Sequence, residues 1–384
     1  MTPAARVQAA AEILDRIAAG TPAEQALLGW SRGARFAGSK DRAAVRDHVF
    51  DVLRRWRSTA ALGGGETGRA RMLGLLRQQE IDPDTLFTGA RHAPEELDAD
   101  ERSAGEAPDG AVALDLPDWL SPLFESSLGS EAAVAAEALR HRAPVFLRVN
   151  ILRTSRDAAQ AALGEEDIVT RPYPLADTAL EVLEGARRVA RSRAFSEGLV
   201  ELQDAASQAV VEALPLGPGM RVLDYCAGGG GKALAMAARL AGPVDAHDAN
   251  TARMSDLPAR AARAGAKIRR EDKPRGPYDL VLCDVPCTGS GSWRRAPEGK
   301  WRLTPEGLDR LRATQAEILR EVAPLVSPGG TLAYATCSVL APENGEQVDA
   351  FLSEHVGWSE TLRRQFLPRD GGDGFFLSCL TRTD

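Results

Sequence analysis

Two of the five cysteines stand in polar turns that follow short apolar runs. Cys287 ends the run Asp284-Val285-Pro286-Cys287, and Cys337 lies in Ala335-Thr336-Cys337-Ser338. A thiol in such a turn can ionise, and a thiolate is both a strong nucleophile and a group that can leave again. Cys287 and Cys337 are therefore candidates for covalent catalysis. Buried cysteines are usually inert small hydrophobes, which is what we expect of Cys226, Cys283 and Cys379.

Methyl transfer to carbon 5 of a cytosine is a reaction that needs such a thiol. This carbon is a poor nucleophile until another group adds to carbon 6, and a thiolate can add there and depart afterwards. The addition pushes electrons toward N3, so a proton donor is needed at that edge of the ring. Asp284 can serve if burial or a neighbouring negative charge keeps a proton on it. The alternative is a carboxylate that only caps the turn.

A glycine-rich loop separates another apolar run from a helical segment at 233–241. Its sequence is Val222-Leu223-Asp224-Tyr225-Cys226-Ala227-Gly228-Gly229-Gly230-Gly231-Lys232. Consecutive glycines cost chain entropy but let a ligand approach the backbone, and the amino terminus of a helix favours negative groups. The loop therefore predicts a ligand site. An ATP-type phosphate loop is excluded, because Cys226 and Ala233 occupy the places that need glycine and Ser or Thr.

Two cofactors remain compatible with this loop. A nicotinamide dinucleotide would accept Gly228-x-Gly230-x-x-Ala233, and Asp248, 20 residues after Gly228, could hold ribose hydroxyls. The same acid suits the ribose of S-adenosylmethionine. Asp224 stands before the glycines, where a carboxylate can face the cationic methionine end of that cofactor. This position, together with the thiol chemistry, favours S-adenosylmethionine.

Strands alternate with helical segments from residue 199 onward, which is typical of a doubly wound parallel sheet. The expected strands span residues 221–225, 243–247, 278–283 and 330–335. Each cysteine turn directly follows one of them. Because the carboxyl ends of parallel strands lie at one edge of a sheet, we expect the two thiols to converge on one cleft.

The preceding residues divide into three parts. Apolar residues at helical spacing in 7–19 and 42–62 predict a helical domain over 1–78. Residues 79–118 lack periodicity, and twelve acidic residues against two arginines lie between 80 and 118, which predicts a mobile acidic linker. Helices, a strand at 145–149, a helix at 155–163 and a strand at 168–172 predict a small α/β unit over 119–198. The catalytic domain takes 199–384.

The net charge of −7 does not exclude a nucleic acid partner, because the charge is unevenly spread. Residues 253–302 carry twelve Lys and Arg against six Asp and Glu, and phosphate contacts need only a basic patch. The five cysteines are widely spaced without a CxxC pair, so we expect reduced thiols and no metal site. No run of about 18 apolar residues occurs. We expect a cytoplasmic monomer without membrane contact.

The cysteine turns and the string Gly229-Gly230-Gly231-Lys232 resemble the signatures of the Sun-type, RsmB-like family of S-adenosylmethionine-dependent RNA cytosine-5 methyltransferases. The resemblance implies that Cys337 is the nucleophile and that Cys287 assists product release. It further implies that Asp284 contacts the cytosine and that Lys232 lies at the active site. Ala233 departs from the family, in which Thr commonly follows the lysine, and this puts one contact of the loop in doubt.

The resemblance extends to most of the chain and implies a complete cofactor site. Strings such as Arg148-Val149-Asn150 and Glu343-Asn344 are similar to the family, and residues 1–75 more weakly resemble its NusB-type helical domain. The implied fold is a Rossmann-like class I methyltransferase domain, a small RNA-binding α/β unit and an all-α domain. The implied substrate is RNA, small-subunit rRNA in particular. The residues expected to bind S-adenosylmethionine are Asp224, Cys226, Ala227, Gly228, Gly229, Gly230, Gly231, Lys232, Asp248, Arg253, Asp272 and Asp284.

Three other functions explain less of the sequence. A DNA cytosine-5 methyltransferase would use Cys287 as its nucleophile and leave Cys337 without a role. A dehydrogenase would leave both thiols and Asp284 unexplained. A non-enzymatic RNA-binding or ribosome-assembly factor with a degenerate methyltransferase domain is the main alternative, and the intact thiols, Asp284, Lys232 and Asp248 argue against it.

Overall fold

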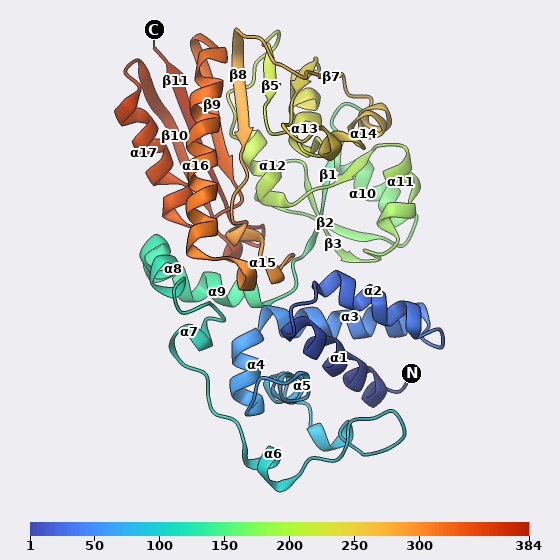
Figure 1. The fold of residues 1–384 in the computed structure, drawn as a ribbon. Coiled ribbons are helices and arrows are strands. Elements are labelled where there is room, and N and C mark those ends of the chain that lie inside the picture. The colour runs from blue at the N-terminus through green and yellow to red at the C-terminus, as the bar shows by residue number, and fades with distance from the viewer. Residues whose placement is uncertain (384) are drawn as a thin grey trace. The chain divides into compact units, whose positions relative to one another are not determined.

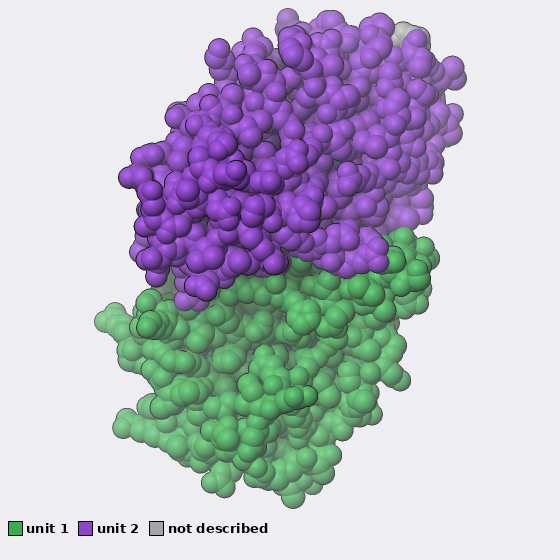
Figure 2. Space-filling view, turned by 180° about the vertical axis from the view of Figure 1, so that it is seen from behind, with its two compact units in different colours: residues 1–142, 293–302 green, residues 143–292, 303–384 purple. Residues whose placement is uncertain are grey.

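The chain is divided into two compact units in a computed structural model that describes residues 1–383. One unit contains residues 1–142 and 293–302, and the other contains residues 143–292 and 303–384 (Figure 2). The predicted boundary at residues 118 and 119 therefore falls inside the first unit, although the functional division into domains stays a prediction.

The first unit is helical, as the apolar spacing predicts. Val45, Val49 and Val52 are fully buried in its core. The helix expected over 42–62 is in fact two helices, because the backbone leaves the helical region at Arg55. The helices of this unit are α1 (Pro3–Ala18), α2 (Ala23–Gly33), α3 (Ser39–Arg54), α4 (Trp56–Gly63), α5 (Gly68–Gln78), α6 (Ala99–Ser103), α7 (Gly110–Ala113), α8 (Ser121–Leu128), α9 (Ala132–Arg140) and α15 (Glu298–Arg302).

The acidic stretch contacts α5 at several points, and its mobility stays a prediction. Arg69 pairs with Glu101 at 2.6 Å, and Arg77 donates to the Leu62 and Ala104 carbonyls at 2.7 and 2.6 Å. Phe87 is buried. Arginines of α5 thus hold parts of a segment whose own composition predicts disorder, and such long-range partners leave no local pattern in the sequence.

Residues 293–302 belong to this helical unit although they lie between catalytic segments of the sequence. The Trp301 indole donates to the Leu53 carbonyl at 2.7 Å, and the Arg54 guanidinium donates to the Arg294 carbonyl at 2.7 Å. Lys300 is almost fully buried, and burial lowers the pKa of its ammonium to about 8. The turn after Cys287 therefore leads directly into the helical unit.

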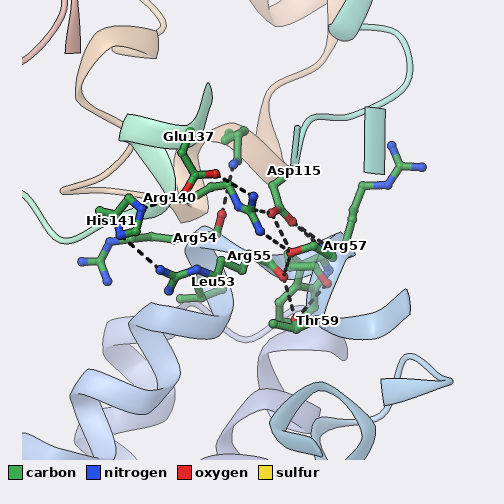
Figure 3. Close-up of polar contacts among 12 residues, drawn as sticks. Leu53, Arg54, Arg55, Arg57, Thr59, Asp115, Glu137, Arg140 and His141 are labelled. Carbon is green, nitrogen blue, oxygen red and sulfur yellow. Dashed lines mark hydrogen bonds and ion pairs between the residues drawn. The ribbon is translucent and has the colours of Figure 1, made fainter. Parts of the chain in front are cut away.

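Asp115 organises the start of α4 (Figure 3). Its fully buried carboxylate accepts hydrogen bonds from the Arg57 and Ser58 amides at 3.0 and 2.9 Å. It also pairs with Arg140 of α9 at 2.9 Å. These contacts satisfy amides that a helix start leaves unpaired, which explains why α4 begins anew after Arg55.

Replacing Asp115 with Ala should destabilise the protein by about 3–5 kcal/mol, because it uncaps α4 and leaves the largely buried Arg140 without its partner. Asp118→Ala is the matched control. Asp118 also pairs with an arginine, Arg57, but its side chain is 82% exposed, so its loss should cost less than about 1 kcal/mol. Urea unfolding of the full chain measures both, and equal effects would contradict this account.

The second unit begins with a small antiparallel sheet in the order β2-β3-β1-β4. Strand β1 (Val145–Val149) has the predicted bounds, and β2 (Val169–Pro172) nearly so. The sequence did not predict β3 (Ala179–Glu184) or β4 (Val200–Leu202). Helices α10 (Arg156–Gly164) and α11 (Arg193–Ser196) complete this part.

The catalytic part contains a seven-stranded sheet in the order β10-β11-β9-β8-β5-β6-β7 (Figure 1). Five neighbouring strands are parallel, of which four were predicted and β7 was not. Strands β11 and β10, also not predicted, are antiparallel at one edge, so the sheet is mixed. The strands are β5 (Val222–Asp224), β6 (Val244–Ala246), β7 (Ile268–Arg270), β8 (Tyr278–Asp284), β9 (Val326–Thr336), β10 (Trp358–Phe366) and β11 (Phe375–Arg382).

Helices cover both faces of this sheet. Val222 of β5 packs in one core with α12 (Ala205–Glu212), α13 (Gly231–Leu240) and α14 (Leu257–Ala264). The next residue, Leu223, packs in the other core with α16 (Pro305–Val322) and α17 (Gly345–Glu354). This alternation gives the doubly wound arrangement and leaves the carboxyl ends of the strands open for a site.

Candidate active site

The two thiols meet at the carboxyl ends of neighbouring strands. Strands β8 and β9 pair in parallel, with Asp284 beside Ala335, and the turns that follow place Cys287 Sγ 3.3 Å from Cys337 Sγ. Both side chains are partly exposed, whereas Cys283 and Cys379 are buried. The predicted convergence of the two thiols is therefore confirmed.

An ion pair lies beside the thiols. Lys232, the second residue of α13, donates to Asp284 Oδ2 at 2.6 Å, and its ammonium lies 4.8 Å from the centre of the Phe375 ring. Burial lowers the pKa of Lys232, but the Asp284 carboxylate outweighs it, so the pKa is raised overall. The Lys232 ammonium is therefore charged at neutral pH, and Asp284 faces this cation as well as the nearby carboxylate of Asp224.

The two thiols differ in acidity. The pKa of Cys337 is lowered, first by its contact with Cys287 and also by the Lys232 charge, against burial and Asp284. The pKa of Cys287 is raised well above its usual value by the contact with Cys337, by burial and by the charge of Glu343. Of the pair, Cys337 is thus the one that is thiolate more readily, as a nucleophile should be.

The glycine loop is held in an open curve between β5 and α13. Gly228 and Gly230 have φ of +51° and +79°, a region that favours glycine. The Gly228 amide donates to Asp248 Oδ2 at 2.9 Å, and Arg253 pairs with the same oxygen at 3.1 Å. A Cβ on Gly230 would lie 2.1 Å from Leu257, so glycine is required there by both conformation and space.

Asp224 has the properties of a cation-binding carboxylate. It is buried, and neither of its oxygens has a hydrogen-bond partner of good geometry among residues 1–383. Burial and the nearby Asp284 charge raise its pKa to about 7, against the lowering effect of Lys232. A buried polar group without a partner is costly, so a cationic ligand at this loop would satisfy it.

The remaining predicted cofactor residues are less closely grouped. Ala227 and Gly229 to Gly231 lie in the loop itself, and Cys226 is partly exposed there, with a pKa raised by burial. Asp272 is exposed, two residues after the end of β7. Among residues 1–383 its carboxylate forms no hydrogen bond or ion pair.

The small sheet contacts the same loop. Arg148 of β1, itself buried, donates to the Gly231 carbonyl at 2.6 Å and to Gln203. Arg260 of α14 donates to the Gly229 carbonyl and pairs with Glu201 of β4 at 3.5 Å. The loop is therefore braced by both parts of the second unit.

Sequence reasoning missed Glu343 as a functional residue. It lies in the turn between β9 and α17, is fully buried, and accepts hydrogen bonds from Thr288 and Ser338, the residues that follow the two cysteines. An acid in a polar turn usually indicates solvent exposure, so only the resemblance of Glu343-Asn344 to the family could have singled it out.

Within residues 1–383, no cluster of three or more His, Cys, Asp and Glu could hold a metal ion. The same part of the chain contains no helix with the length and apolarity to span a membrane.

Comparisons with known proteins place these features in a family. Residues 211–381 match the 16S rRNA methyltransferase RsmB/F family, and residues 116–190 match the ferredoxin-like domain of RsmF/B-like methyltransferases. The "Ribosomal RNA small subunit methyltransferase B" proteins of Cronobacter sakazakii and Salmonella arizonae are both 34% identical over 284 residues. These matches cover 69% of this chain and 66% of the relatives, so the chain spans just under two thirds of their length.

Two solved structures share the fold. The protein PH0851 matches with a TM-score of 0.77 and 23% identity over 99% of both chains. NSun6 from Pyrococcus horikoshii with SFG matches with a TM-score of 0.62 and 16% identity, over 70% of this chain and 99% of that one. The predicted combination of a helical region, a small α/β domain and a methyltransferase domain is thereby confirmed. The chain belongs to the RsmB/F family of 16S rRNA methyltransferases.

Proposed function

We propose that the protein transfers a methyl group from S-adenosylmethionine to carbon 5 of a cytosine in RNA, with small-subunit rRNA as the substrate. The observation that carries this proposal is the 3.3 Å approach of Cys287 and Cys337 beside the Lys232–Asp284 pair. Family membership and the names of the relatives support the substrate class. The cytoplasmic location and the monomeric state stay predictions.

The residues around the glycine loop fit S-adenosylmethionine. Asp224 offers an unpartnered buried carboxylate to a cation. Asp248, which accepts a hydrogen bond from the Gly228 amide, offers its carboxylate to ribose hydroxyls. Arg253 and Asp272 remain expected contacts, and the solved NSun6 relative with SFG supports a ligand site in this fold. The bound cofactor supplies the electrophilic methyl group.

Cys337 opens the reaction by adding to the base. Its thiolate forms a bond to carbon 6, and the electron pair of the 5,6 double bond moves toward N3. The Lys232 ammonium, held by Asp284 at 2.6 Å, is the proton donor that we assign to that edge of the ring, with Asp284 as the contact to the cytosine. Carbon 5 is then nucleophilic enough to take the methyl group.

Release requires a base and a leaving group. A base removes the proton on carbon 5, the electron pair of that C–H bond restores the 5,6 double bond, and the bond between carbon 6 and Cys337 breaks, with sulfur leaving as thiolate. The proton on N3 returns to the Lys232 amine. Cys287 is the group that assists this step, since its sulfur lies 3.3 Å from that of Cys337.

The test of the function is tritium release from small-subunit rRNA that carries tritium on carbon 5 of cytosine. Release that depends on S-adenosylmethionine supports the proposal. Bisulfite sequencing of rRNA and tRNA from a deletion strain then locates the cytosine. A protein that binds this RNA but releases no tritium would be the non-enzymatic assembly factor.

Cofactor affinity should increase with pH because Asp224 must be ionised to pair with the methionine ammonium. With its pKa raised to about 7 by burial, the ionised fraction rises steeply between pH 6 and pH 7.5, and affinity should rise about fivefold to tenfold over that interval. Calorimetric titrations with S-adenosylmethionine measure this change. Asp224→Asn should bind more weakly and lose the dependence; the same pH slope in that variant would disprove the role.

A further inference from the structure

Glu343 joins the two thiol-bearing turns with a single carboxylate. Its Oε1 accepts hydrogen bonds from the Thr288 amide at 2.8 Å and from Gln315 Nε2 at 3.1 Å. Its Oε2 accepts from the Thr288 hydroxyl at 2.5 Å and from the Ser338 hydroxyl at 2.6 Å. Because Thr288 follows Cys287 and Ser338 follows Cys337, these bonds hold the two turns against each other.

The four contacts match the acceptor sites of an ionised carboxylate. Such a group offers about four lone-pair sites, and the four donors fill them. All four donors are uncharged, and within residues 1–383 Glu343 forms no ion pair. Its negative charge is therefore not cancelled locally, although the side chain is fully buried.

The charges around the two sulfurs differ. The Glu343 charge acts on Cys287 and raises the pKa of its thiol, in addition to the larger effects of the Cys337 contact and of burial. Cys337 faces Asp284, whose charge raises its pKa, and Lys232, whose charge lowers it by less. Each thiol thus has a carboxylate near it, and the Lys232 ammonium lies on the Cys337 side.

We propose that Glu343 is a positioning residue that makes the two thiols unequal: its carboxylate ties their turns together and keeps the proton between the sulfurs on Cys287, so that Cys337 is the thiolate. The catalytic role of this difference between the thiols rests on the proposed function. Bond formation to carbon 6 removes the negative charge of Cys337, which is the main group that holds the proton on Cys287. Cys287 can then give that proton to solvent and, as a thiolate, accept the proton from carbon 5 at the release step.

Thiol alkylation tests this assignment without RNA or cofactor. The full chain is treated with iodoacetamide at pH 7, and peptide mass spectrometry measures the labelling of each cysteine. Wild type should be labelled at Cys337 in preference to Cys287. Glu343→Gln keeps the side chain's size and can still bond to both turns, but it removes the charge. The preference should fall by about tenfold, which corresponds to about one pKa unit between the thiols.

Glu346→Gln is the matched control, since Glu346 lies three residues away with a side chain that is 56% exposed, and its labelling should equal that of wild type. Buried Cys283 reports unfolding. An unchanged preference in Glu343→Gln, with Cys283 unlabelled, would overturn the assignment.

If Glu343→Gln does not fold, a second variant tests whether the Glu343 charge sets the labelling preference. Gln315→Lys leaves Glu343 in place and sets an ammonium against its Oε1, so the same loss of preference is expected, and an unchanged preference overturns the assignment. A wild-type protein that fails to methylate RNA yet shows the labelling preference would refute the proposed function and leave the role of Glu343 intact.

Discussion

Cys287→Ala should accumulate a protein–RNA adduct that survives denaturation, whereas Cys337→Ala should form none. If Cys337 adds to carbon 6, its loss leaves carbon 5 without activation, and turnover should fall by at least about 10³-fold while RNA and cofactor still bind. If Cys287 serves only the later step, its loss permits attack and methyl transfer but traps the enzyme on its product. The double variant should lose the adduct again.

A denaturing gel after incubation with rRNA and S-adenosylmethionine measures the adduct. Cys379→Ala is the control, because Cys379 is a buried cysteine of β11 and its loss removes a thiol without touching the site. That variant should turn over and show no stable adduct. An adduct on Cys337→Ala and none on Cys287→Ala would reverse the roles of the two thiols.

The parallel strands next to the thiols could be predicted from the sequence because each contains a short, mainly apolar run. Strands β5, β6, β8 and β9 are buried on both faces by helices, which gives this pattern. Strand β10 lies at the sheet edge and alternates between exposed and partly buried residues with several charges, so it was missed. Strand β4 has only three residues, too few for a period to show.

The break between α3 and α4 had no local signal, since neither glycine nor proline stands near Arg55. Its cause is Asp115, whose carboxylate caps α4 from 58 residues further along the chain, at Arg57. Residues 293–302 likewise pack with the helical unit, which the surrounding catalytic sequence does not indicate. Such contacts depend on the whole fold and leave no periodic pattern.

The positions of the two thiols could be predicted from the sequence, but the charged groups beside them could not. The rule that parallel strands end at one edge was enough to bring Cys287 and Cys337 together. The partner of Asp284 was not foreseen, because a lysine on α13 reaches it across the sheet edge at 2.6 Å. In the mechanism that we propose, the Lys232 ammonium takes the place of the protonated carboxyl that the reaction chemistry first suggested.

Lys232→Met should therefore lower kcat by about 10²–10⁴, the range expected for a lost proton donor in a transition state. The variant also removes the cation that lowers the pKa of Cys337, so the thiolate should form only at higher pH. Because Lys232 likewise lowers the pKa of Asp224, cofactor binding near pH 7 should weaken too, by less than the loss in kcat.

The pH profile of single-turnover methyl transfer separates these effects. At saturating cofactor, the rising limb of the profile should move to higher pH in Lys232→Met, and the rate at its plateau should stay low because the donor at N3 is missing. Lys267→Met, which removes an exposed lysine of the same unit, should leave both the rate and the limb unchanged. A Lys232→Met enzyme with a normal plateau but a shifted limb would mean that the lysine only acidifies Cys337, and the proton at N3 would then have to come from another donor.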